Sequence, residues 1–283
     1  MLGRAVVKVF ASAGDNVSGW DVSDGDLADE KTAMRAVEST RPDLVINCAG
    51  FTDVEACEDA FREAEVKAGN VLVPRFLARA CEKNFVPMIH ISTDYVFDGD
   101  KEGPYVESDV TNPVSQYGKS KLEGEIAVTE ELPRAHLILR TAWLYGPHGR
   151  NFIDTIRGAA RTRKSLRVVD DQIGCPTFVF DLAEAILACA RARCTGILNA
   201  VNAGQTTWYG LTKKIMEISG ASGVSVQPCS TDQYPAKAKR PKNSVLSCEK
   251  LAQTTGFRFR PWQEALEAYL TGSYPGGDSA GAA

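Results

Sequence analysis

A tyrosine and a lysine four residues apart, Tyr117 and Lys121, are the residues of this chain best suited to acid–base chemistry. On a helix this spacing places both side chains on one face. A neighbouring ammonium group favours the phenolate, so we expect the pKa of Tyr117 to lie below the usual tyrosine value of about 10. Such a tyrosine can give or take a proton near neutral pH. Because surface helices also carry this pair by chance, its surroundings must support the interpretation.

The stretch before the pair supplies hydroxyl groups at the end of a predicted strand. Residues 86–91 are mostly apolar, and Ser92 and Thr93 follow them directly. Ligands of open α/β sheets bind beyond the carboxyl ends of the strands. We therefore predict that Thr93 orients the oxygen of a reacting carbonyl that Tyr117 protonates, with Ser92 as the alternative for that role.

Composition and charge exclude several classes of protein. The chain has 283 residues, of which 44% are hydrophobic and 24% charged, as in ordinary globular proteins. It has neither a run of about 20 apolar residues nor a signal-peptide pattern, so we expect a cytoplasmic protein without membrane association. A net charge of −4 argues against nucleic-acid binding. The eight cysteines and three histidines lack metal-ligand spacing, so we expect free thiols and no metal.

The order of apolar and amphipathic segments predicts an α/β fold, a doubly wound parallel sheet with helices on both faces. We expect a helix over 3–13 and strands over 16–22, 43–49, 86–91 and 136–141. The predicted organisation is a dinucleotide-binding domain (1–150), a smaller substrate lobe (151–271) with segments that return to the first domain, and a disordered tail (272–283).

The start of the chain departs from the pattern of a dinucleotide-binding fold. Such a fold opens with a strand that runs into a glycine-rich turn, whose backbone amides hold the pyrophosphate. Here only Leu2-Gly3-Arg4 corresponds to the end of that turn. We therefore expect the printed sequence to be an N-terminally truncated form, with a genuinely shortened, cofactor-free protein as the alternative.

Seven motifs spread over most of the chain resemble those of the extended short-chain dehydrogenase/reductases, and among these the dTDP-4-dehydrorhamnose reductases. The motifs are NCAGFTDVEACE (47–58), STDYVFDG (92–99), YGKSKLEGE (117–125), RTAWLYG (140–146), NF (151–152), DQIGCPT (171–177) and RPKNSVL (240–246). The resemblance implies NAD(P)H-dependent reduction of dTDP-4-dehydro-L-rhamnose to dTDP-L-rhamnose. A second copy of the chain, in a homodimer, is the one protein partner we consider for such an enzyme, although no motif specifies the oligomeric state. Two alternatives stay open: another nucleotide-sugar reductase or epimerase, and a regulatory subunit of methionine adenosyltransferase, which keeps the same motifs.

The resemblance also implies which residues bind the ligands. NADPH or NADH is expected at Gly3, Asp26, Leu27, Ala49, Gly50, Tyr117 and Lys121. The dTDP-sugar is expected at Thr52, Val54, Tyr95, Trp143 and Arg240. Within these sets, Trp143 could equally be a core aromatic and Arg240 a surface residue. The guanidinium of Arg240 is suited to a diphosphate because it can donate two parallel hydrogen bonds.

Overall fold

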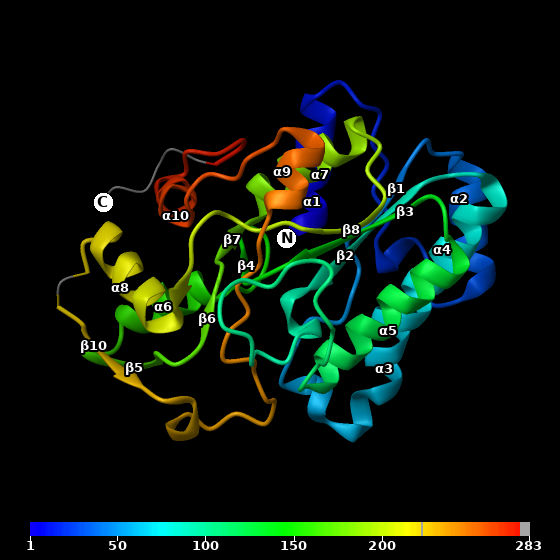
Figure 1. The fold of residues 1–283 in the computed structure, drawn as a ribbon. Helices are drawn as coiled ribbons and strands as arrows, with labels where there is room; N and C mark the ends of the chain where they lie inside the picture. The colour runs from blue at the N-terminus through cyan, green and yellow to red at the C-terminus, as the bar shows by residue number, and fades with distance from the viewer. Residues whose placement is uncertain (222, 278–283) are drawn as a thin grey trace.

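A four-stranded parallel sheet forms the centre of the molecule in the computed structural model, which describes residues 1–221 and 223–277 (Figure 1). The strand order is β1 (Val45–Asn47), β2 (Met88–Thr93), β3 (His136–Thr141) and β8 (Gly196–Asn199). Every residue of β2 and β3 is buried, which explains their largely apolar sequences. The Rossmann-type parallel sheet that the sequence predicts is therefore confirmed.

Helices cover both faces of this sheet. On one face lie α2 (Glu30–Thr40), α3 (Glu63–Lys67), α4 (Val73–Asn84) and α5 (Gln116–Glu131), with a π-helical turn, Ala68–Leu72, between α3 and α4. On the other face lie α1 (Leu2–Ser12), α7 (Val179–Arg191), α9 (Glu249–Thr255) and α10 (Trp262–Thr271). Figure 1 shows α4 and α5 side by side along the first face. Each face buries its own apolar core against the sheet.

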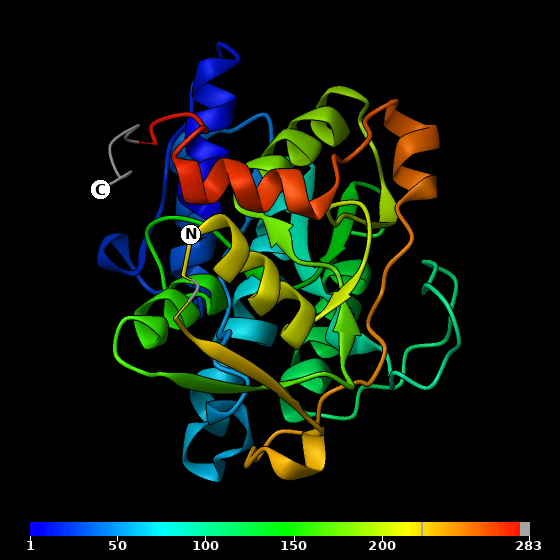
Figure 2. The same cartoon turned by 90° about the vertical axis from the view of Figure 1, so that its left-hand side faces the viewer.

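A smaller lobe lies beside the sheet and faces the viewer in Figure 2. Its two-stranded parallel sheet is packed against two helices, and two short strand pairs connect it to the rest of the chain. The elements are β5 (Ser165–Val169) with β10 (Ser225–Cys229), α6 (Phe152–Ala160), α8 (Trp208–Ile218), β4 (Leu144–Tyr145) with β7 (Thr177–Phe178), and β6 (Ile173–Gly174) with β9 (Thr206–Thr207). Two elements that lie among these in the chain return to the main sheet: α7 packs on α1, and β8 pairs with β3.

The strand predicted over 16–22 is wrong. Among residues 1–221 and 223–277 the segment has no ladder partner, and it ends in one of the five short 3₁₀ helices found there. These helices span Val22–Asp24, Ala56–Glu58, Ala60–Arg62, Asp94–Val96 and Thr231–Gln233. An extended segment becomes a strand only beside a hydrogen-bonding neighbour, and within the described residues no strand pairs with the outer edge of β1 either.

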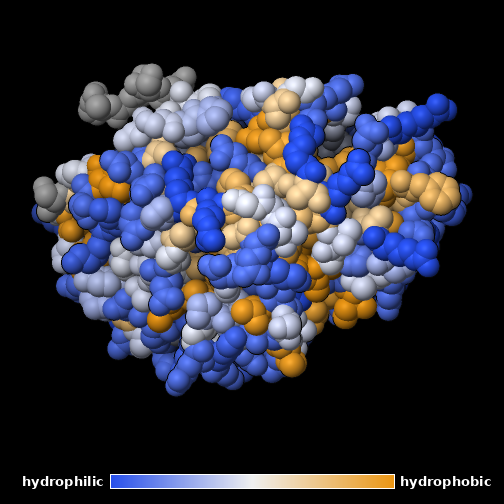
Figure 3. All heavy atoms as spheres, turned by 45° about the horizontal axis from the view of Figure 1, so that its top comes forward, coloured by the Kyte–Doolittle hydropathy of each residue, from blue (hydrophilic) through white to orange (hydrophobic). Residues whose placement is uncertain are grey.

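The C-terminal segment and the surface complete the fold. Residues 272–277 form turns rather than the disordered segment we expected, and residues 278–283 lie outside the described residues. In the part of the chain that the structure describes, no helix is both long and apolar enough to cross a membrane. Figure 3 shows small apolar patches scattered among charged and polar side chains on one face of the molecule.

Candidate active site

The three residues predicted to be catalytic meet at the carboxyl end of β2. Helix α5 begins at Gln116 because the side chain of Ser115 accepts a hydrogen bond from Gly118 N and so caps the helix. This start places Tyr117 in the first turn, within hydrogen-bonding contact of the Thr93 hydroxyl. One turn later, the buried Lys121 donates from Nζ to the carbonyl oxygen of Ile91 at 2.7 Å.

Ser92 and Thr93 point to opposite sides of the strand, as consecutive strand residues do. The Ser92 hydroxyl donates to Oε1 of Glu125 at 2.5 Å. The Thr93 hydroxyl donates to Oδ1 of Asp94 at 2.9 Å and lies against Tyr117. The geometry therefore favours Thr93 over Ser92 as the hydroxyl beside the proton donor.

The pKa of Tyr117 lies above its usual value, so the expectation of a lowered pKa is wrong for this structure. Burial of the phenol raises the pKa of Tyr117, and the hydrogen bond with Thr93 offsets only part of that rise. The ammonium of Lys121 points instead to the carbonyl oxygen of Ile91. Burial also lowers the pKa of Lys121 to about 8, although the carboxylate of Glu125 opposes this shift.

Close approach of α5 to the end of β2 depends on a glycine next to the catalytic tyrosine. A Cβ built at Gly118 would overlap the carbonyl oxygen of Tyr95. We expect Gly118→Ala to push α5 away from Thr93, to destabilise the fold by about 1–3 kcal/mol and to lower kcat. Denaturant unfolding and steady-state kinetics measure both effects.

The matched control is Gly158→Ala in α6, where an added Cβ meets nothing within 4 Å. That exchange should stabilise the protein by roughly 0.5–1 kcal/mol, because alanine favours a helix more than glycine does. Equal effects of the two alanines would contradict the close-approach explanation.

A buried carboxyl group that the sequence analysis missed lies beside Thr93. Asp94 is only 2% exposed, and it interacts with the hydroxyls of Thr93 and Ser244. Burial raises the pKa of Asp94 to about 7. Its position directly after Thr93, at the end of the predicted strand, could have indicated that Asp94 belongs to the site.

The raised pKa of Asp94 makes a prediction about stability. A carboxyl whose pKa is higher in the folded than in the unfolded state stabilises the fold at low pH, and this contribution is lost as pH rises from about 4 to 7. Asp94→Asn should therefore gain stability relative to the wild type across that window and no further above it. Urea unfolding at several pH values tests this, with the exposed Asp100→Asn as control; parallel pH curves for the wild type and Asp94→Asn would contradict it.

The predicted cofactor residues lie in two places. Ala49 and Gly50 are exposed at the carboxyl end of β1, and a Cβ at Gly50 would be 3.7 Å from Lys121 Nζ. The absence of a side chain at Gly50 thus leaves the lysine approachable. Gly3 lies near Cys48, which directly precedes Ala49. The predicted pair Asp26 and Leu27 lies just before α2; Asp26 accepts a hydrogen bond from Ala28 N at 2.8 Å and is exposed.

The loop that carries Gly50 is held by a buried asparagine that the sequence analysis also missed. Asn70, in the π-helical turn, accepts from Phe51 N at 2.8 Å and donates to Phe51 O at 3.0 Å. Its amide also donates to Ser120 Oγ on α5 at 2.9 Å. One side chain therefore fixes the loop after β1 against the helix that carries Lys121.

Of the predicted substrate residues, Tyr95 lies against Tyr117, and Arg240 contacts Tyr95. The rings of Tyr95 and Tyr117 meet edge to face with centroids 5.7 Å apart. Arg240 hydrogen-bonds Tyr95, and its Nη2 lies 2.6 Å from Oε1 of Glu55. In the same loop as Glu55, the exposed Thr52 and the half-buried Val54 follow Gly50.

Trp143 is held by stacking within the protein. Its ring lies parallel to that of Trp208, with centroids 3.5 Å apart. Its other side is against Gly174, where an added Cβ would come within 2.5 Å of the indole. Because both faces are covered, a substrate contact from Trp143 would use the edge of the ring. In this arrangement neither face of the Trp143 ring is open to a ligand.

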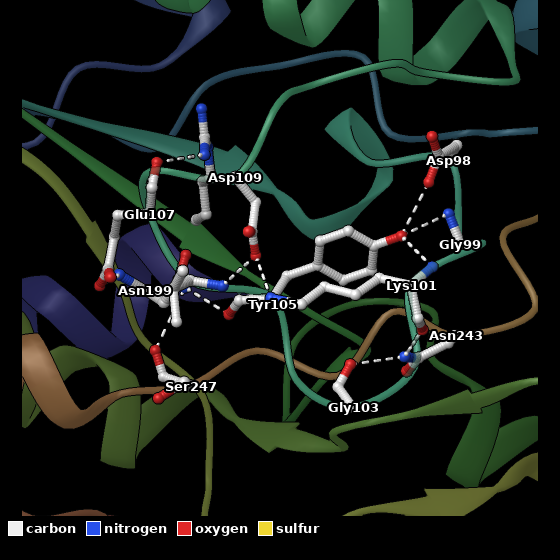
Figure 4. Close-up of polar contacts among 12 residues, drawn as sticks. Asp98, Gly99, Lys101, Gly103, Tyr105, Glu107, Asp109, Asn199, Asn243 and Ser247 are labelled. Atoms are coloured by element: carbon white, nitrogen blue, oxygen red, sulfur yellow. Dashed lines mark hydrogen bonds and ion pairs between the residues drawn. The ribbon is translucent and has the colours of Figure 1, made fainter.

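The loop between β2 and α5 is pinned around Tyr105 (Figure 4). The Tyr105 hydroxyl accepts from Gly99 N at 2.9 Å and Lys101 N at 3.1 Å, and it donates to Asp98 at 2.8 Å. Asn199, at the end of β8, donates to the Tyr105 carbonyl oxygen at 3.1 Å. These bonds fix the path by which the chain leaves Thr93 and returns at Tyr117.

A Rossmann-type sheet with a threonine, a tyrosine and a lysine at the carboxyl ends of its strands defines a nucleotide-cofactor-dependent oxidoreductase. The family model of the RmlD substrate binding domain matches residues 1–274, and the chain belongs to this family. It is 40% identical to a dTDP-4-dehydrorhamnose reductase of Sinorhizobium fredii over 252 residues, which cover 85% of this chain and 83% of that protein.

Two further relatives extend the comparison. A dTDP-4-keto-6-deoxy-D-glucose reductase of Streptomyces niveus is 36% identical over 271 residues, which cover 94% of this chain and 92% of that protein. The crystal structure of dTDP-4-dehydrorhamnose reductase from Bacillus anthracis in complex with NADP superimposes with a TM-score of 0.90 at 32% identity, covering 95% of this chain and 94% of that one. The fold and the family are therefore the ones that the sequence motifs predict.

Proposed function

We propose that this chain reduces the 4-keto group of dTDP-4-dehydro-L-rhamnose, with NADPH or NADH, to give dTDP-L-rhamnose. The observation that carries the proposal is the meeting of Thr93, Tyr117 and Lys121 at the carboxyl end of β2 in a member of this family. The free state of all eight cysteines supports a reducing, cytoplasmic compartment.

The chemistry assigned to the protein is binding, orientation and proton transfer. A bound nicotinamide supplies the hydride that reaches the carbonyl carbon. Tyr117 gives its proton to the oxygen that becomes the new hydroxyl. Thr93 orients the same oxygen. Lys121, one helical turn away on the same face of α5, is assigned to the nicotinamide end of the cofactor. Exposed Ala49 and Gly50, next to Lys121, would hold the nicotinamide end of the cofactor.

The substrate is assigned to the surface between the loop after β1 and the segment around Arg240. Tyr95 borders Tyr117, and the exposed Thr52 and half-buried Val54 belong to the same surface. Arg240 would exchange its ion pair with Glu55 for the diphosphate, which offers two oxygens to the guanidinium. Gly3, Asp26 and Leu27 are assigned to the far end of the cofactor.

The test follows the absorbance of NADPH with two substrates that differ at the sugar, dTDP-4-dehydro-L-rhamnose and dTDP-4-dehydro-6-deoxy-D-glucose. The proposal expects oxidation of NADPH and a dTDP-L-rhamnose product with the first, at a higher kcat/KM than with the second. Preference for the second sugar would identify a different nucleotide-sugar reductase. Failure to oxidise NADPH with either sugar, together with binding to a methionine adenosyltransferase, would replace the enzyme by a regulatory subunit.

A further inference from the structure

A buried ion pair ties the helix of the catalytic tyrosine to both central strands. Glu125 on α5 and Arg140 on β3 are each only 4% exposed in their side chains. Arg140 donates from Nε to Oε1 at 3.0 Å and from Nη2 to Oε2 at 2.7 Å. The hydroxyl of Ser92 on β2 donates to Oε1 at 2.5 Å. One carboxylate therefore joins three elements of the site.

The residues of this network neighbour the catalytic residues but are not catalytic themselves. Glu125 follows Lys121 by one helical turn, so both side chains lie on the same face of α5. Ser92 directly precedes Thr93, and the carbonyl oxygen that binds Lys121 belongs to Ile91, the residue before Ser92. A change in the network would thus reach both Lys121 and the strand end that carries Thr93.

We propose that Glu125 and Arg140 are positioning residues of the reductase site, and that the Glu125 carboxylate keeps Lys121 charged and seated against β2. The inference rests on the proposed function, because it assigns Lys121 its role there. Glu125 touches neither the reacting carbonyl nor the hydride donor; it acts through Lys121.

Among the titratable groups near Lys121, Glu125 is the one that carries a negative charge. The other titratable groups that bear on Lys121 are Cys48 after β1, His90 on β2 and Tyr117 on α5. Burial raises the pKa of Cys48 to about 12, lowers that of His90 well below its usual value and raises that of Tyr117, so all three are uncharged at neutral pH. Among these groups Glu125 alone supplies a negative charge.

A double variant can separate a positioning role of Glu125 and Arg140 from a purely structural one. Replacing both partners of a buried ion pair by uncharged residues of similar volume leaves no unpaired buried charge, whereas removal of one partner is strongly destabilising. The double variant Glu125→Gln/Arg140→Met should therefore keep the fold while it removes the carboxylate near Lys121. Any effect on Lys121 can then be separated from an effect on stability.

The experiment titrates the Lys121 side-chain nitrogen of the whole protein by ¹⁵N NMR and compares it with the pH dependence of kcat. In the double variant we expect the Lys121 midpoint and the alkaline limb of kcat to move down together by up to about one pH unit. The carboxylate one helical turn away is lost, and loss of the Arg140 guanidinium offsets only part of that change. Glu123→Gln, an exposed acid on the same helix, should change neither.

A second variant keeps the test decisive if the double variant does not fold. Glu125→Gln alone preserves the shape of the side chain, and it should lower the midpoint further because it leaves Arg140 without its counter-ion. An unchanged Lys121 midpoint in whichever of the two variants folds would overturn the proposal. If the wild type turns over no sugar, the proposed function fails, while the NMR titration still decides whether Glu125 sets the charge of Lys121.

Discussion

Replacing Tyr117 by phenylalanine should lower kcat by about 10²–10⁴-fold while the protein stays folded. General acid groups contribute rate factors of this size, and the exchange removes only the hydroxyl that lies against Thr93. The ring would keep its edge-to-face contact with Tyr95. Stopped-flow measurement of NADPH oxidation at saturating sugar, combined with thermal unfolding, separates loss of chemistry from loss of structure.

Tyr209→Phe is the matched control for this result. Tyr209 lies on α8 in the smaller lobe, and its ring contacts Lys213 rather than the site. The control should keep wild-type kcat. If Tyr117→Phe turned over within a few-fold of wild type, another group would have to be the proton donor.

Replacing Lys121 by methionine should reduce kcat by at least about 10²-fold and at the same time stabilise the fold at pH 7. A pKa lowered from 10.5 to about 8 means that burial disfavours the ammonium by roughly 3 kcal/mol. Methionine removes that penalty, although it also loses the hydrogen bond to Ile91. Urea unfolding and steady-state kinetics give the two effects.

The pH dependence of this stabilisation has a definite sign. The folded wild type binds the Lys121 proton more weakly than the unfolded chain does, so its stability rises as pH increases from about 8 to 10.5. The advantage of Lys121→Met should shrink across that range. The exposed Lys119→Met on the same helix should leave both activity and stability close to wild type. A methionine variant that is both inactive and strongly destabilised at pH 7 would mean that Lys121 is mainly structural.

The two central strands of the sheet could be predicted because they are buried on both faces. Strands β2 and β3 are apolar runs that cannot be solvent-exposed, and their carboxyl ends carry the polar residues. The segment 16–22 has a similar local pattern, but whether a segment becomes a strand depends on a neighbour that local sequence does not specify. Whether a segment forms a strand therefore depends on its neighbours in the sheet, which composition does not show.

The site was predictable where spacing along one element placed side chains together, as for Tyr117 and Lys121. The same spacing continues to Glu125, so the i, i+4, i+8 series was a signal that could have revealed the buried acid. Its partner Arg140 comes from β3, and no local pattern connects the two. The raised pKa of Tyr117 was equally out of reach, because burial is a property of the packed structure.

Contacts between distant segments could not be predicted from the sequence. The motif assigned Trp143 to the sugar and left a core aromatic as the alternative; in the structure its faces are covered by Trp208 and Gly174, from two distant segments. The pairing of Arg240 with Glu55 likewise joins residues far apart in sequence.

The most direct test of the reductase assignment is the transfer of a label from cofactor to sugar. The protein is incubated with dTDP-4-dehydro-L-rhamnose and NADPH that carries deuterium at both hydrogen positions of nicotinamide C4, and the product is analysed by proton NMR and mass spectrometry. The account predicts dTDP-L-rhamnose with deuterium at sugar C4, formed in step with NADPH consumption and abolished by Tyr117→Phe. Recovery of the unreduced keto sugar with unchanged cofactor, or of a reduced sugar without deuterium at C4, would contradict it.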